Sequence, residues 1–100
     1  MGATVNKADR KRLNRVAELG CIICRRLGFP GTPALIHHPR AGMGISQRAP
    51  HSEAIGLCHA HHVGPESVHM LGAKGLFEAT FGFSEADLVA ETKQLLGEAQ

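Results

Sequence analysis

Two pairs of potential metal ligands constrain this chain more than any other feature. Cys21 and Cys24 form a Cys-x-x-Cys pair, and Cys58 and His61 form a Cys-x-x-His pair further along the chain. Two such pairs suit a tetrahedral Zn²⁺ ion, because structural zinc sites take four Cys or His ligands. The first pair can form a turn whose backbone amides point at the sulfurs. The second can occupy the first turn of a helix, where residues three apart share a face.

The fourth zinc ligand stays open among neighbouring histidines. His61 has the spacing of a paired ligand, but His59 and His62 flank it. Four protein ligands leave no position for water, so such a zinc ion stabilises the fold rather than catalysing a reaction. Three buried free thiols are the alternative, but a Cys₃His site accounts for the odd number of cysteines.

The composition indicates a small core that needs this support. The 100 residues make one domain, 1–100, with 43% hydrophobic and 20% charged residues. Trp and Tyr are absent and there are four Phe, whereas seven histidines lie between His37 and His69. A core poor in aromatic residues is weak, so we expect metal to contribute to folding.

Charge is divided unevenly along the chain. The first 50 residues hold nine Lys and Arg and two acids, and the last 50 hold two Lys and seven acids, for a net charge of +2. A basic half favours a polyanionic partner such as nucleic acid, and a solvated basic helix is the plainer alternative.

The sequence favours a location in the cytoplasm, without membrane association. No apolar run approaches the length of a membrane span. The first residues also lack the charged-then-apolar pattern of a signal peptide.

The hydrophobic pattern of the first two thirds predicts an α+β unit with short strands. Residues 7–19 form a basic amphipathic helix, and residues 34–38 and 54–57 form two strands. A helical turn begins at Cys58, so that residues 20–64 make a zinc-bound ββα core.

Residues 70–98 are expected to form two C-terminal helices. The first spans 73–81 and the second spans 85–96, with Ser84 as its N-cap. The side chains expected to complete the core here are Leu76, Phe77, Phe81, Phe83, Leu88 and Leu95.

A second set of histidines points to a second metal. His37 and His38 end the first predicted strand, where adjacent side chains face opposite sides. One can face a metal and the other solvent or substrate. His62 projects about 100° around its helix from His61, so one turn can serve two metals. Two histidines from separate elements suit a catalytic metal, and ordinary surface histidines are the alternative.

The order of these motifs resembles the HNH (ββα-metal) nucleases on a treble-clef zinc scaffold. The shared features are the Cys-x-x-Cys pair, Ile36-His37-His38, a glycine-containing loop and Leu57-Cys58-x-x-His61-His62. The stretch 42–81 resembles more narrowly the phage recombination-enhancement (Ref-like) HNH nucleases. The resemblance covers residues 20–83. It implies a treble-clef/ββα-metal zinc domain with an N-terminal helix and two C-terminal helices.

The resemblance also implies a role for each histidine. His37 matches the ligand of a catalytic divalent metal, Mg²⁺ or another ion. His38 matches the general base that takes a proton from the attacking water, and His62 matches the closing metal ligand. His61 stands where many members have a second Cys.

Some positions depart from the family pattern or carry weaker assignments. The middle Asn is absent from this region, where His51 or Glu53 would take its place. His69 is a candidate third metal ligand or a surface histidine. Arg40 and Arg48 are candidates for phosphate contact or solvated loop residues.

These observations predict a metal-dependent HNH endonuclease acting on DNA in a bacterial or phage-infected cytoplasm. A recombinase filament is a further candidate partner. The sequence offers no aromatic residues placed for base stacking and no recognition helix, so we expect low sequence specificity. A non-catalytic treble-clef zinc module that binds nucleic acid or protein is the alternative, and a toxin-like or restriction-like nuclease would share the chemistry. The oligomeric state is left undetermined.

Overall fold

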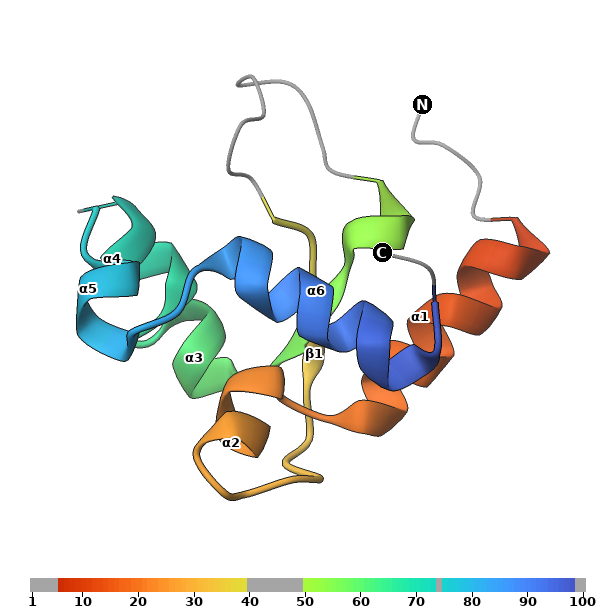
Figure 1. The fold of residues 1–100 in the computed structure, drawn as a ribbon, viewed down its shortest axis with the longest axis horizontal. Helices are drawn as coiled ribbons and strands as arrows, with labels where there is room; N and C mark the ends of the chain where they lie inside the picture. The colour runs from red at the N-terminus through yellow and green to blue at the C-terminus, as the bar shows by residue number, and fades with distance from the viewer. Residues whose placement is uncertain (1–5, 40–49, 74, 99–100) are drawn as a thin grey trace.

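A short antiparallel hairpin lies at the centre of the fold (Figure 1). Strand β1 (Leu35–His37) pairs with β2 (Ile55–Leu57), and β2 is buried at every position. Both strands predicted from the sequence are confirmed, each in shorter form. Isolated two-stranded hairpins are marginal in water, so the surrounding helices must supply the burial. The computed structural model describes three stretches of the chain: residues 6–39, 50–73 and 75–98.

Helix α1 (Lys7–Leu19) confirms the expected basic helix and packs against both strands. Asn6 begins it, because its side chain accepts a hydrogen bond from the Asp9 backbone N–H at 2.8 Å. The helix ends at Gly20, which has a φ of 78°. A Cβ at Gly20 would lie 2.6 Å from the carbonyl oxygen of Thr32, so the close return of the chain here requires glycine.

The first cysteine pair belongs to a short helix rather than to a simple turn. Helix α2 (Ile22–Arg26) follows directly, with Cys21 as its N-cap. The backbone N–H of Cys21 donates to the Thr32 carbonyl at 2.8 Å, which anchors the loop that returns to β1. Ile22 and Ile23 are fully buried beneath this loop. The cysteine pair therefore sits on the core rather than at its edge.

Three short helices follow the hairpin. Helix α3 (His59–Val63) begins at Cys58, as expected, and contacts both strands and α4 (Val68–Ala73). The expected helix at 73–81 is wrong in its start, because α5 begins at Phe77 (Phe77–Phe81). Gly75 follows α4 with a φ of 70°. The N–H groups of Gly75 and Leu76 donate back into α4, a common helix stop.

Helix α6 (Glu85–Leu96) has the predicted bounds and runs across the hairpin in Figure 1. Ser84 and Asp87 form a capping box, in which each side chain accepts from the backbone N–H of the other. The buried side chains of α6 are Leu88, Val89, Thr92 and Leu96.

The prediction of a buried core position is wrong for two residues. Leu76 is 47% exposed and Leu95 is 43% exposed. Leu95 lies at the edge of the buried stripe of α6, and Leu76 lies in the break before α5 rather than inside a helix. Phe77, Phe83 and Leu88 are buried as expected.

Three of the four phenylalanines form one cluster. Phe77, Phe81 and Phe83 lie with ring centroids 5.1–6.0 Å apart, and the Phe81 ring meets the His61 ring edge-on at 5.9 Å. Three of the few aromatic side chains are thus concentrated beside His61, one residue of the second ligand pair.

Arg12 joins three parts of the chain that are far apart in sequence. Its side chain is 9% exposed and pairs with Glu98 at 2.9 Å. It also donates to the carbonyls of His51 and Ala54, at 2.8 and 3.0 Å, at the ends of the 3₁₀ turn η1 (His51–Glu53). The N-terminal helix, η1 and the C-terminal segment therefore share one buried cation.

In the stretches that the structure describes, no helix has the length and hydropathy needed to cross a membrane.

Replacing Arg12 by Leu should lower the free energy of unfolding by about 3 kcal/mol, because Glu98 and two carbonyls lose their partner. Urea denaturation of the zinc-loaded protein measures this. Arg10→Leu, at an exposed position of the same helix, is the matched control and should change stability by under about 0.5 kcal/mol. Equal stabilities of the two variants would contradict the assigned role.

Candidate functional site

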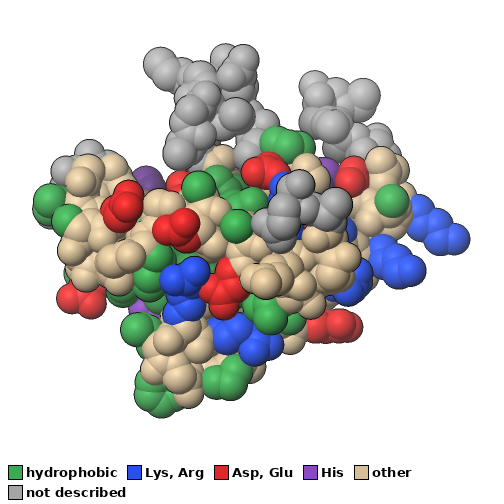
Figure 2. Space-filling view, viewed as in Figure 1, with side chains coloured by type: hydrophobic (Ala, Val, Ile, Leu, Met, Phe, Trp, Pro, Cys, Tyr) green, Lys and Arg blue, Asp and Glu red, His purple; other side chains and the backbone are tan. Residues whose placement is uncertain are grey.

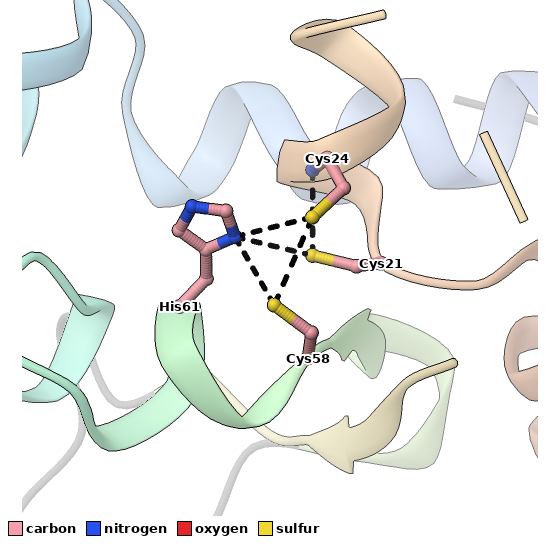
Figure 3. Close-up of side chains that lie close together, drawn as sticks. All are labelled: Cys21, Cys24, Cys58 and His61. Atoms are coloured by element: carbon pink, nitrogen blue, oxygen red, sulfur yellow. Dashed lines mark hydrogen bonds between the residues drawn. The ribbon is translucent and has the colours of Figure 1, made fainter. Parts of the chain in front are cut away.

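Four side chains from two separate segments point toward one another (Figure 3). Cys21 and Cys24 come from the start of α2, and Cys58 and His61 come from the start of α3. Their ligand atoms all lie within 4.8 Å of one another. The backbone N–H of Cys24 donates to Cys21 Sγ at 3.4 Å, as expected for a Cys-x-x-Cys turn.

Four distances within this group are close to those of a tetrahedral zinc site. His61 Nδ1 lies 3.6, 3.5 and 3.3 Å from the sulfurs of Cys21, Cys24 and Cys58. The sulfurs of Cys24 and Cys58 lie 3.8 Å apart. Zinc bond lengths place two sulfurs about 3.8 Å apart, and sulfur and nitrogen about 3.6 Å apart, in a tetrahedron. The group can therefore hold a zinc ion, with His61 rather than His59 or His62 turned into it.

Burial changes the pKa values of the side chains in this group. Burial raises the pKa of the Cys24 thiol from 9.0 to about 12. Burial acts in the same direction on Cys58, but hydrogen bonds from the backbone of His61 bring the pKa of Cys58 below its usual value. Burial lowers the pKa of His61, which keeps its imidazole neutral and able to bind metal. A positive ion is what allows three adjacent sulfurs to be thiolates together.

Four half-buried histidines form two pairs at the end of β1. The ring of His37 lies edge-on to that of His62, with centroids 5.1 Å apart. The ring of His38 lies 5.0 Å from that of His51, and His38 Nε2 lies 2.9 Å from His51 Nδ1. Neighbouring strand residues face opposite sides, so the doublet separates into one pair with α3 and another with η1.

Of the pair of His37 and His62, His62 has surroundings that favour the neutral imidazole. Burial lowers the pKa of His62, and the charges of His37, His69 and His59 lower it further. His62 is therefore neutral at neutral pH, which is the metal-binding form. His69 is exposed on α4, near enough for its charge to reach His62. Within the described stretches, only the Cys₃His group brings three or more potential ligand atoms together.

Among the other predicted residues that the structure describes, Glu53 lies outside these pairs. The Glu53 side chain bonds to Lys93 on α6 at 2.6 Å. Arg40 and Arg48, the candidates for phosphate contact, lie outside the described residues.

One residue near the histidines was missed by sequence reasoning. Glu85 Oε2 lies 2.6 Å from His37 Nε2, and both side chains are largely buried. Glu85 precedes Val89, Thr92 and Leu96 at helical spacing, so it occupies the buried stripe of α6. In the sequence, an acid that continues an apolar helical stripe is the signal that could have identified Glu85.

The basic half of the chain is partly used inside the protein. Arg12 and Arg15 bond to the C-terminal segment, and Arg26 pairs with Glu91 while lying over the ring of Phe83. Lys and Arg side chains remain gathered over α1 in Figure 2. The exposed ones near its start are Lys7, Arg10 and Lys11.

Comparison with known families identifies the chain. The family described as recombination enhancement, RecA-dependent nuclease, matches residues 4–96. The chain belongs to this family. No curated protein matches it.

Membership of the RecA-dependent nuclease family agrees with the resemblance in the sequence. The match extends beyond residues 20–83 at both ends and includes both α1 and α6. These helices are therefore part of the family's unit rather than additions to a zinc core. The family description supports a nuclease role for the chain.

Replacing His61 by Ala should remove the bound zinc and unfold the chain. Structural zinc contributes about 10–16 kcal/mol of apparent binding free energy, as much as a small domain's whole stability of about 5–15 kcal/mol. Zinc content by mass spectrometry and helicity by circular dichroism measure the effect. His59→Ala, at an exposed position two residues away, should keep one zinc per chain. Loss of zinc from His59→Ala but not from His61→Ala would contradict the assigned ligand set.

Proposed function

We propose that this chain is a metal-dependent HNH endonuclease that hydrolyses DNA phosphodiester bonds with low sequence specificity. The hairpin followed by α3, joined through the Cys₃His group to α2, supports a treble-clef/ββα-metal fold with a structural zinc ion. One domain would span residues 1–100. The three unpaired cysteines suit a reducing compartment, so we infer action in the cytoplasm.

The contact between His37 and His62 carries this proposal. The two rings come from the strand and the helix of the ββα unit, and they meet at a centroid distance of 5.1 Å. His62 follows the zinc-group residue His61 in the same turn of α3. The zinc group thus fixes α3 against the hairpin, and the neighbouring histidine is fixed with it.

His37 and His62 would hold the catalytic divalent metal, with His69 as a further ligand. When bound, such an ion polarises the phosphate and stabilises the leaving oxygen. Two imidazoles leave other coordination positions open for water and phosphate. Imidazole nitrogens suit Zn²⁺, Ni²⁺ and Fe²⁺ better than Mg²⁺, so the donor set favours a transition metal, although Mg²⁺ remains a candidate.

His38 would act as the general base on the attacking water. A neutral imidazole can accept a proton from water at neutral pH. The 2.9 Å contact between His38 Nε2 and His51 Nδ1 orients the ring. In the proposed tautomer, Nε2–H of His38 would donate to His51 and leave Nδ1 of His38 to accept the proton.

We assign the place of the missing motif Asn to His51 rather than to Glu53. His51 contacts the base, whereas the carboxylate of Glu53 is held by Lys93. The backbone of His51 is held in turn by Arg12. A bracing residue needs a fixed backbone, and this arrangement supplies it.

DNA phosphates would lie along the exposed basic residues at the start of α1. Lys7, Arg10 and Lys11 are outside the ion pairs that engage Arg12, Arg26 and Lys93 in the described structure. Phosphate contacts of this kind position DNA without reading its sequence. A recombinase filament is proposed as a further partner, from the family description.

Replacing His38 by Ala should lower DNA cleavage by about 10²–10⁴-fold without loss of zinc, because only the proton acceptor is removed. Nicking of supercoiled plasmid and of single strands in a recombinase filament measures the rate with Mg²⁺, Mn²⁺, Ni²⁺ or Zn²⁺. His59→Ala, which lies outside both histidine pairs, is the control and should cleave normally.

The same assay distinguishes the nuclease from the alternative, a non-catalytic zinc module that binds nucleic acid or protein. Absence of cleavage by purified wild type, in every metal and with every DNA form, would overturn the nuclease proposal. Full activity of His38→Ala would overturn the assignment of the base.

Replacing Lys7, Arg10 and Lys11 together by Gln should weaken DNA binding equally for all sequences. The slope of log affinity against log salt should decrease by about 0.9 for each phosphate that these side chains no longer neutralise. Fluorescence anisotropy over a salt series measures this slope. Lys93→Gln, which removes a lysine paired with Glu53, should leave the slope unchanged. An unaltered slope in the triple variant would show that DNA binds elsewhere.

A further inference from the structure

Glu85 occupies a position where an acid is costly without a partner. It is the first residue of α6 and continues the buried stripe of Val89, Thr92 and Leu96. Its side chain is 15% exposed. Burying a carboxylate is unfavourable unless another group bonds to it. The partner of the Glu85 carboxylate should therefore explain why an acid occupies this position.

The contact of Glu85 is with one ring nitrogen of a histidine. Glu85 Oε2 lies 2.6 Å from Nε2 of His37, whose side chain is 11% exposed. Such a short distance is typical of a charge-assisted hydrogen bond, in which the imidazole N–H donates to the carboxylate. The proton on Nε2 leaves the lone pair of the neutral ring on Nδ1.

Glu85 is held rigidly at the start of its helix. The capping box of Ser84 and Asp87 fixes the first turn of α6 on both sides of it. A carboxylate in this turn is also stabilised by the helix dipole. The acceptor for the His37 proton is thus placed by the backbone of α6 rather than by a flexible loop.

We propose that Glu85 is a positioning residue for His37. It holds the Nε2–H tautomer and directs Nδ1 to the divalent metal that His37 shares with His62. This inference rests on the proposed function, because it deepens the site assigned to His37 and His62. Carboxylates that accept from a metal-ligating histidine raise its basicity and fix its orientation, and their removal costs about 10–100-fold in metal affinity or activity.

Two variants and one control test this role. Glu85→Ala removes the acceptor, and Glu85→Gln keeps a neutral acceptor of the same shape. Glu91→Ala is the matched control, because it breaks another ion pair of α6, the one with Arg26, without removing a partner of any histidine. These variants and the wild type are studied with zinc loaded, and thermal melting confirms that each is folded.

The first readout needs no catalytic metal. Nitrogen-15 NMR of the histidine rings should show His37 as the Nε2–H tautomer in wild type, in Glu85→Gln and in Glu91→Ala. Glu85→Ala should show a mixture of tautomers. The second readout is Mn²⁺ affinity by calorimetry, with His37→Ala as baseline. Affinity should fall about 10–100-fold in Glu85→Ala and less in Glu85→Gln.

The outcomes separate this inference from the proposed function. An unchanged His37 tautomer and unchanged Mn²⁺ affinity in Glu85→Ala would overturn the role of Glu85, whether or not the protein cleaves DNA. Mn²⁺ binding that depends on Glu85 would support it even if wild type cleaved no DNA, and the nuclease proposal alone would then fail. Equal losses in Glu85→Ala and Glu91→Ala would also overturn it, because the ion pair would then be merely structural.

Discussion

The Cys₃His group is the constraint on which the rest of the structure depends. It joins the start of α2 to the start of α3, and so fixes both against a hairpin whose strands have three residues each. Neither strand could hold its partner unaided. The buried residues Ile22, Ile23 and Leu57 lie close to these ligands in sequence. A zinc ion here would replace much of the apolar core that a chain poor in aromatic residues lacks.

The same group positions one of the other histidines. His62 adjoins His61 in one turn of α3, so that ordering His61 also orders His62 against His37. On the other side of β1, His38 meets His51. The Cys₃His group and the proposed catalytic metal site are therefore coupled through geometry, because the one short helix α3 carries His61 of the first and His62 of the second.

The charge asymmetry of the chain has two consequences. Part of it holds the fold together, since basic residues of the first half pair with acids of α6 and the segment after it: Arg12 with Glu98 and Arg26 with Glu91. In the described stretches, the start of α1 keeps an exposed basic surface suited to phosphate. Counting charges from the sequence overestimates such a surface, because a buried arginine and an exposed one look alike in composition.

Local patterns in the sequence were sufficient to predict the helix at 7–19, the capping of α6 by Ser84 and the two ligand pairs of the Cys₃His group. Each of these features depends on residues a few positions apart. They did not predict the break at Gly75 or the exposure of Leu95, since helix ends and stripe edges depend on what packs against them. The contact of Glu85 with His37 joins residues 48 positions apart. The sequence by itself therefore determined the membership of a nuclease family and the four residues of the group that can hold zinc, whereas only the tertiary structure decided which distant side chains stand beside the histidines.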